Sequence, residues 1–249
     1  MTTAVTNSTL SNGFRLLEHM AARGGWQRVT ELARDLDLPK SHVCRLLKTL
    51  ADVGYVEQDT ATRRYAISLK TLWLSNTLLR GLSIRNRLRP ALQSLAGQTG
   101  RPGYLLVPTD DGPLVVDVVH PDGFTDDPGV VLGELLPVTT SASGKLFAAL
   151  LENFGSEQVR AEVGSSTGAR RFRSSLDGVE RKGVAVADGE RGPNVYAAAA
   201  PVTDAAGECV AAIGAASFDE KLSAAAKRRL ARAVRDAAQA HSAADDEVA

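Results

Sequence analysis

Residues 29–67 read VTELARDLDLPKSHVCRLLKTLADVGYVEQDTATRRYAI, and this stretch decides the fold of the N-terminal part of the chain. Apolar residues recur at helical spacing on both sides of Asp37-Leu38, so the pattern predicts two amphipathic helices joined by a tight turn. Pro39 opens the second helix, at a position where its missing N–H removes no helical hydrogen bond. Gly54 ends that helix, because glycine readily adopts the left-handed backbone of a helix terminus.

The hairpin that follows completes a recognisable motif. Two short segments rich in Tyr, Val and Ile flank the polar stretch 58–64, and this alternation predicts a β-hairpin over 55–67. Upstream, helical periodicity begins near Ser11, places Phe14 on the same inner face as Leu17, and stops at Gly24-Gly25. The resulting order of helix, helix, turn, helix and hairpin is that of a winged helix-turn-helix, which binds DNA.

The second helix of the pair has two unlike faces. Successive helical residues rotate by about 100°, so Val43, Leu46, Leu47 and Leu50 share the face that should pack inward. The other face and the hairpin tip carry donors suited to phosphates and to base edges in the major groove. With Thr30, the expected N-cap of the preceding helix, these donors form the predicted DNA-binding set: Thr30, Lys40, Ser41, His42, Arg45, Lys48, Thr49, Arg63 and Arg64.

Within that set the residues have different expected roles. Arg45 can donate two hydrogen bonds to guanine, which discriminates against other bases by about 1–3 kcal/mol. Lys40 and Lys48 are expected to neutralise phosphates, and Arg63-Arg64 to reach an adjacent backbone or narrow groove. The alternative, a merely solvated helix face, would suit an isolated helix but is disfavoured within the complete winged arrangement.

Length and composition place the chain among ordinary globular proteins. Its 249 residues suit two modest domains, with 44% hydrophobic and 23% charged residues. Net charge is zero, but residues 1–70 contain ten Lys/Arg against seven Asp/Glu, which puts the modest basic excess in the predicted DNA-binding part.

Several classes of site are disfavoured by the sequence. Cys44 and Cys209 lie far apart, and the four histidines show no ligand spacing, so we expect no disulfide, no metal site and no cofactor. Cys44 is expected to be a small, part-buried packing residue. The longest apolar stretches fall short of the roughly 18 residues of a membrane helix, and the polar start resembles no signal peptide. A cytoplasmic protein without a membrane partner is expected.

Beyond the hairpin, the pattern indicates a linker helix and an α+β domain. We predict a disordered N-terminus over 1–10, the winged domain over 11–68, a linker helix over 69–82, a second domain over 83–242 and a disordered tail over 243–249. A helix ending at Gly100 should be kinked or divided at Pro90. The period then changes, with expected strands in GYLLVP, PLVVDVV, GVVLGEL, VYAAAAPV and CVAAIGAAS, and expected helices in SGKLFAALL, SEQVRAEV, SSLDGVERKG and AAAKRRLARAVRDAAQAHSA.

The chain resembles the IclR family of bacterial transcriptional regulators over residues 11–240. The motifs that carry the resemblance are LPKS, RLLxTL, GYVEQD…RYAI, the Gly144-Lys145 pair in LPVTTSASGKLFAALL, and the block RKGVAVADGERGPNVYAAAAPVTDAAGECVAAIGAASF. The resemblance implies a GAF-like second domain with a cavity for a small organic effector, and homodimers often paired into tetramers. It also implies a pseudo-palindromic double-stranded operator, with repression the commoner mode.

The effector site implied by the resemblance departs from the family pattern. Backbone N–H groups at a helix start bind anions, which favours the segment 142–144, although Ser143 could simply cap that helix. By register with Glu190, Pro201 and Ser217, the family's polar pocket positions are small and apolar here, while a shift of one residue would bring in their neighbours Asp188 and Tyr196. The predicted effector-binding set is Ala142, Ser143, Gly144, Ala187, Asp188, Ala197, Gly214 and Ala216.

The small residues at these pocket positions affect which ligand would fit. Missing side chains should enlarge the cavity and favour a bulky, mostly apolar molecule with one carboxylate over a small keto acid. Absence of any effector stays open as an alternative. Enzymatic use of the second domain is disfavoured, because Asp188 and Glu190, although close together in sequence, lie near a turn where acids usually face solvent. A protein-interaction module with a degenerate DNA motif is a third reading. Exposed-looking Trp73 and Leu74 suggest a pairing surface, unless the linker helix packs on its own domain.

The sequence therefore predicts a sequence-specific DNA-binding transcriptional regulator, not an enzyme. Its promoter binding would be modulated by a small, rather apolar organic effector.

Overall fold

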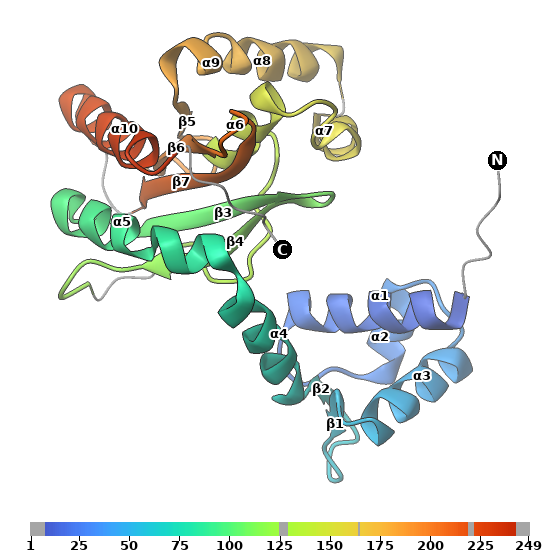
Figure 1. Ribbon diagram of the computed structural model, residues 1–249. Helices are drawn as coiled ribbons and strands as arrows, with labels where there is room; N and C mark the ends of the chain where they lie inside the picture. Colours follow the sequence, from blue (N-terminus) through green and yellow to red (C-terminus); the bar gives the residue numbers. More distant parts are fainter. Residues whose placement is uncertain (1–7, 125–128, 164, 219–221, 243–249) are drawn as a thin grey trace. The chain divides into compact units, whose positions relative to one another are not determined.

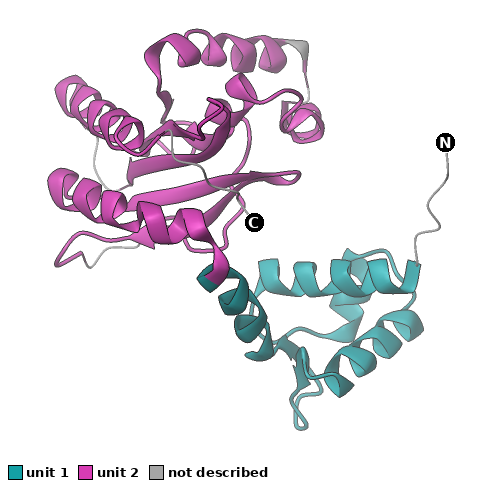
Figure 2. Cartoon of the chain, in the orientation of Figure 1, with its two compact units in different colours: residues 1–80 teal, residues 81–249 magenta. Residues whose placement is uncertain are grey.

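The computed structural model describes residues 8–124, 129–163, 165–218 and 222–242. The chain divides into two compact units, Met1–Arg80 and Gly81–Ala249 (Figure 2). The division falls inside the predicted linker. The predicted disordered ends lie outside the described residues, apart from 8–10, which belong to a helix.

The first unit has the elements of a winged helix-turn-helix (Figure 1). Helices α1 (Ser8–Arg23), α2 (Val29–Asp35) and α3 (Lys40–Asp52) precede an antiparallel hairpin of β1 (Val56–Gln58) and β2 (Tyr65–Ile67), and helix α4 (Lys70–Gly81) follows. Asp37, at a φ of 52°, forms the turn between α2 and α3. One apolar cluster holds the helices and the hairpin together, built from Leu16, Met20, Leu32, Val43, Leu46, Leu47 and Val56.

Four details of this unit differ from expectation. Helix α1 begins three residues earlier than Ser11, and Phe14 is 57% exposed although its spacing placed it on the inner face. Thr30 is not the N-cap of α2, because Arg28 precedes the helix and its N–H donates to the Glu31 carboxylate at 3.2 Å. Cys44, expected to be part-buried, is exposed.

The second unit is a five-stranded antiparallel sheet with helices on both faces (Figure 1). The strand order is β4-β3-β7-β6-β5. The strands are β3 (Gly103–Thr109), β4 (Gly112–Val119), β5 (Ala185–Asp188), β6 (Tyr196–Thr203) and β7 (Cys209–Ser217). The helices are α5 (Ser83–Thr99), α6 (Ala142–Leu150), α7 (Ser156–Val163), α8 (Ser166–Leu176), α9 (Val179–Lys182) and α10 (Ala224–Gln239).

Side chains alternate between the two faces of this sheet, as pleated strands require. The Tyr196 hydroxyl donates to the backbone oxygen of Lys227 in α10 at 3.2 Å, so Tyr196 faces the side that α10 covers. Its neighbour Ala197 points to the opposite face, where α6 packs. The two faces therefore have different partners, and the α6 face encloses the cavity described below.

Three other expectations for this unit need correction. Residues 129–135 form turns rather than a strand, with only an isolated bridge between Leu114 and Leu135. Pro90 does not divide the helix that contains it, because α5 runs as one helix from Ser83 to Thr99. The helix expected over 174–183 is broken at Gly178, whose φ of 78° is a backbone conformation that continues no helix. Helix α8, which precedes it, was not predicted.

Candidate DNA interface and effector cavity

Helix α3 presents the two faces that its sequence predicts. Val43, Leu46 and Leu47 are buried against α1 and α2. The predicted contact residues of the other face are open to solvent, with His42 half-buried: Lys40, Ser41, His42, Arg45, Lys48 and Thr49. Thr30 is also exposed, on α2. A polar, basic helix face is thus held on a rigid apolar support.

Arg45 is oriented by a neighbour on its own helix. A guanidinium nitrogen of Arg45 lies 3.0 Å from Nδ1 of His42, and Nε2 of that ring lies 3.4 Å from the Asn12 amide nitrogen of α1. The Thr49 hydroxyl donates to the backbone oxygen of Arg45 at 3.1 Å. The imidazole thus links the exposed arginine to the body of the unit and restricts its conformations.

The hairpin tip is organised by Asp59. Its carboxylate accepts from the Thr62 hydroxyl at 2.6 Å and from the N–H groups of Ala61 and Thr62 at 2.8 and 3.2 Å. These hydrogen bonds, that of the hydroxyl first, lower the pKa of Asp59 below its ordinary value. The ordered tip carries Arg63, which is exposed, and Arg64, which is half-buried.

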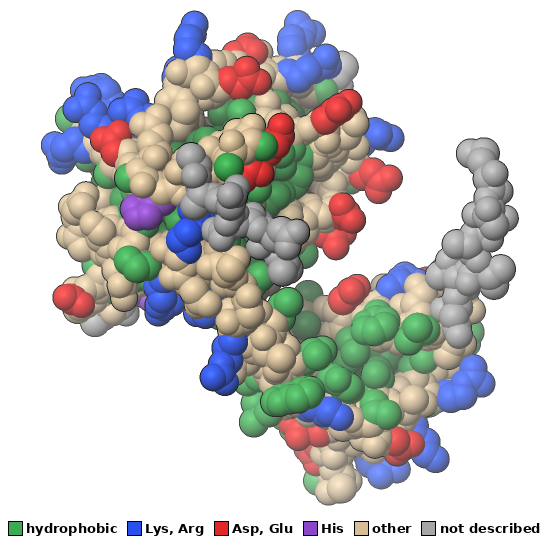
Figure 3. Space-filling view, in the orientation of Figure 1, with side chains coloured by type: hydrophobic (Ala, Val, Ile, Leu, Met, Phe, Trp, Pro, Cys, Tyr) green, Lys and Arg blue, Asp and Glu red, His purple; other side chains and the backbone are tan. Residues whose placement is uncertain are grey.

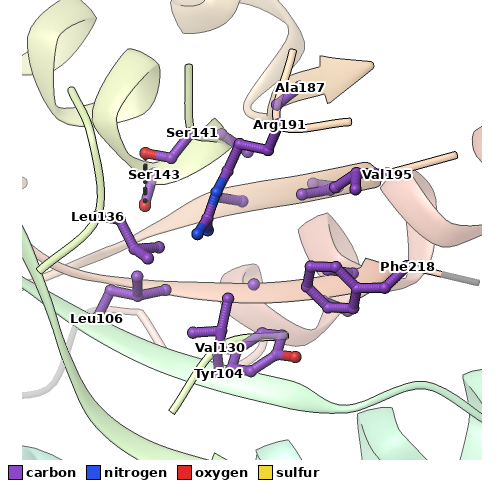
Figure 4. A pocket seen from close by; sticks show the side chains of 17 residues that line it. Tyr104, Leu106, Val130, Leu136, Ser141, Ser143, Ala187, Arg191, Val195 and Phe218 are labelled. Carbon is purple, nitrogen blue, oxygen red and sulfur yellow. Dashed lines mark hydrogen bonds between the residues drawn. The ribbon is translucent and has the colours of Figure 1, made fainter. Parts of the chain in front are cut away.

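The second unit contains an apolar cavity on the α6 face of the sheet (Figure 4). In the strand register Ala187 lies opposite Ala197, and Ala197 opposite Ala216. Of the two alternatives left open by the sequence, the small residues face the cavity, and their neighbours Asp188 and Tyr196 do not line it. Residues that line the cavity include Tyr104, Leu106, Val130, Leu136, Ser141, Ala142, Ser143, Ala187, Arg191, Val195, Ala197, Gly214, Ala216 and Phe218.

Two predicted site residues do not line this cavity. Asp188 points away from it, and its carboxylate binds the Lys227 ammonium at 2.6 Å. Gly144 has a structural role, since a Cβ there would lie 2.3 Å from the backbone oxygen of Val138. Its N–H already donates to the Ser141 hydroxyl at 2.9 Å, so Ser141, not Ser143, caps α6.

The cavity is smaller than the sequence suggested, with a volume of about 40 Å³. Small residues on β5, β6 and β7 do leave space, but larger side chains from neighbouring segments fill most of it. Tyr104 enters from β3 and Phe218 from the end of β7, while Leu136 enters from the segment before α6 (Figure 4). These partners lie far apart in the sequence, so strand periodicity gave no sign of them.

Sequence reasoning also missed the charged groups beside the cavity. Lys145, on α6, is 3% exposed, binds the Glu190 carboxylate and donates to the backbone oxygen of Val186 at 3.2 Å. Arg191 lines the cavity itself and donates to Glu134 at 3.1 Å. The turn that carries Glu190 and Arg191 has no periodic pattern from which side-chain direction could be read.

Other chemistry finds little support among the described residues. They contain no cluster of three or more His, Cys, Asp or Glu that could hold a metal ion. Burial raises the pKa of the Cys209 thiol to about 12, which disfavours the nucleophilic thiolate. None of the helices that the structure describes could span a membrane, by length and hydropathy.

Comparison with known families accounts for both units. Residues 9–60 match the IclR helix-turn-helix domain, and residues 76–243 match the family described as bacterial transcriptional regulator IclR C-terminal. The glycerol operon regulatory protein of Streptomyces griseus is 31% identical over 93% of this chain and 96% of its own length. The transcriptional repressor IclR of Escherichia coli is 28% identical over 57% of this chain and 53% of its own length.

A solved structure agrees with the fold. The IclR transcriptional regulator from Alicyclobacillus acidocaldarius superimposes with a TM-score of 0.78, covering 95% of this chain and 98% of that one. At 22% sequence identity this likeness concerns the architecture alone.

Two glycine substitutions in the second unit should change its stability in opposite directions, because only Gly144 lies close to the backbone of Val138. Gly144→Ala should destabilise the second unit by roughly 1–3 kcal/mol, because the new methyl group meets a backbone oxygen that cannot move freely. Gly97→Ala, inside α5 with nothing within 4 Å of the added atom, should stabilise it by about 0.5–1 kcal/mol. Differential scanning calorimetry of the full chain measures both, and unchanged stability of Gly144→Ala would show that α6 is not held by this contact.

Proposed function

The chain belongs to the IclR family of bacterial transcriptional regulators, and from that premise we propose that it represses transcription by binding a specific operator. Helix α3 and the hairpin are the parts that would contact DNA. The observation that carries the proposal is the solvent-facing set of donors on α3, held by an intact winged helix-turn-helix. Repression is favoured because relatives of this chain, such as that of Escherichia coli, are named repressors.

The proposed DNA contacts divide by chemistry. Arg45 reads a base edge, because its guanidinium is exposed and oriented by His42. Lys40 and Lys48 neutralise phosphates, and Ser41 and Thr30 add hydrogen bonds to the backbone. Arg63 at the ordered hairpin tip binds a neighbouring backbone or groove, with Arg64 beside it.

We also propose that a small molecule in the cavity of the second unit modulates operator binding. The first N–H groups of a helix have no intrahelical partner. In α6 the N–H of Gly144 donates to the Ser141 hydroxyl and is therefore already satisfied. The N–H groups of Ala142 and Ser143, at the cavity wall, are then available to an anionic ligand. Ala187, Ala197, Gly214 and Ala216 supply the apolar wall, which supports a ligand with apolar parts. A catalytic role for this unit has no such support.

Helix α4 is the proposed surface for pairing with a second copy. It has no buried residue. Leu69, just before the helix, and Leu72, Trp73, Leu74 and Leu78 on it have exposed fractions between 55% and 81%. Figure 3 shows hydrophobic side chains gathered on the surface of the first unit. Trp73 and Leu74 are exposed, as the sequence predicted. An apolar surface of this extent favours association, and dimers gain affinity by binding two half-sites of a pseudo-palindromic operator.

The base-reading role predicts different outcomes for two substitutions on one helix. Arg45→Ala should cost roughly 1–3 kcal/mol at the preferred operator and reduce discrimination between sequences, because one base contact is lost. Lys48→Ala should weaken binding to all DNA sequences alike. It should also make the slope of log affinity against log salt concentration shallower by about one unit. Gel-shift titrations at several salt concentrations measure both effects, and circular dichroism controls for folding. Unchanged sequence preference in Arg45→Ala would refute base reading.

The pairing surface predicts a change in oligomeric state. Trp73→Glu should turn a dimer into a monomer and lower operator affinity, because a charge would be buried in the interface. Leu132→Glu places the same charge on an exposed apolar residue of the second unit and should leave the dimer intact. Sedimentation velocity distinguishes the states, and a dimeric Trp73→Glu protein would exclude α4 from the interface.

A further inference from the structure

One charged side chain reaches into the otherwise apolar cavity of the second unit. Arg191 comes from the turn between β5 and β6, and Figure 4 shows its side chain entering the cavity on the side of Ser143 and Leu136. Among the described residues that line the cavity, Arg191 alone carries a charge. Its side chain is 25% exposed, so it is largely withdrawn from water yet accessible to a ligand that enters.

The partner of Arg191 holds it through a single contact. One terminal nitrogen of the guanidinium donates to Oε1 of Glu134 at 3.1 Å, whereas a guanidinium can offer two parallel hydrogen bonds to one carboxylate. The other oxygen of Glu134 accepts from the N–H of Val131 at 3.0 Å. Glu134 is 28% exposed, so its carboxylate could turn into water at little desolvation cost.

We propose that Arg191 is the residue that recognises the effector, and that the ligand's carboxylate replaces that of Glu134 on the guanidinium. This rests on the proposed effector function of the cavity. Arg191 would be neutralised by an anion both before and after binding, so the cavity never holds an unpaired, largely buried charge. The ligand can form the two parallel hydrogen bonds that Glu134 does not, which gives the exchange its driving force.

The exchange also reaches the segment that carries Glu134. That segment is joined to β4 by bonds from the N–H of Val115 to Glu134 O at 3.0 Å and from the N–H of Leu136 to Pro113 O at 2.9 Å. Release of the Glu134 side chain removes its link to the turn after β5. Ligand binding thereby uncouples two segments at the cavity mouth, and this is a local change through which occupancy can be sensed.

The size and lining of the cavity define the class of ligand. A volume of about 40 Å³ accommodates roughly three water-sized groups, at about 10–15 Å³ for each. An apolar cavity of about 150 Å³ can bind benzene, and the cavity here is much smaller. The wall opposite Arg191 is apolar, so the part of the ligand beyond its carboxylate is a short hydrocarbon. A branched aliphatic monocarboxylate with a three-carbon tail, of which isobutyrate is the simplest probe, fits both limits.

Isothermal titration calorimetry of the full chain tests this assignment with four probes. The affinity for isobutyrate should be at least about tenfold higher than that for isobutyramide, which has nearly the same shape but no charge to pair with Arg191. Pyruvate should bind more weakly than isobutyrate, because its keto oxygen enters an apolar wall. Benzoate should also bind more weakly, because its ring exceeds the cavity. Equal affinity for acid and amide, preference for pyruvate or benzoate, or no binding of isobutyrate overturns the proposal.

Three variants separate recognition from structure. Arg191→Gln should reduce isobutyrate affinity about tenfold or more, whereas Glu134→Gln should increase it, because a neutral amide competes less for the guanidinium. Arg160→Gln, on α7, is the control and should change nothing. Opposite effects at the two ends of one ion pair would not arise from loss of structure. Wild-type affinity in Arg191→Gln, or weakened binding in Glu134→Gln, contradicts the exchange.

Gel shifts with the same variants keep the two proposals apart. Arg191→Gln should bind operator DNA as the wild type does, because the substitution lies in the second unit. If the unaltered chain itself fails to bind operator DNA, the proposed function is contradicted. The calorimetric result with isobutyrate would still decide the role of Arg191.

Discussion

The antiparallel register of β5, β6 and β7 is the constraint on which the second unit depends. Side chains alternate between the faces of a sheet, so a slip by one residue would exchange the two faces completely. The observed pairing of Ala187 with Ala197, and of Ala197 with Ala216, places small side chains together under α6. The same register sends Tyr196 and Asp188 toward Lys227 of α10. Cavity and helix packing therefore follow from one alignment of strands.

Small side chains on three strands do not by themselves produce a large cavity. Protein interiors are close-packed, and the space they leave is occupied by Tyr104, Leu136 and Phe218 from other segments. What remains is a small apolar space with Arg191 as its charged wall. Under our proposal this combination would select a ligand by tail size and by charge, two properties that the strand residues alone could not supply together. The rest of the α6 face is ordinary core.

Much of this could be predicted from sequence, and the failures share a physical cause. The winged motif, the inner face of α3 and the strand register follow periodicities of 3.6 and 2, which local sequence records. The exposure of Phe14 and the positions of the helix N-caps, Arg28 and Ser141, depend on how chain ends and neighbouring segments pack. Periodicity therefore placed Phe14 on the wrong face and missed both N-caps. Arg191 lies in a turn, where side-chain direction follows no period. The size of the cavity depends on residues distant in sequence.

We propose that this chain reads a specific DNA sequence through α3. Genome-wide footprinting of the full-length protein in its own cells tests it most directly, with a variant lacking the Arg45 side chain in parallel. A regulator of this kind should protect a small number of discrete sites that share a two-fold symmetric sequence, and the variant should lose those sites while folding normally. Protection spread along the genome without a common sequence, unchanged in the variant, would contradict specific operator recognition.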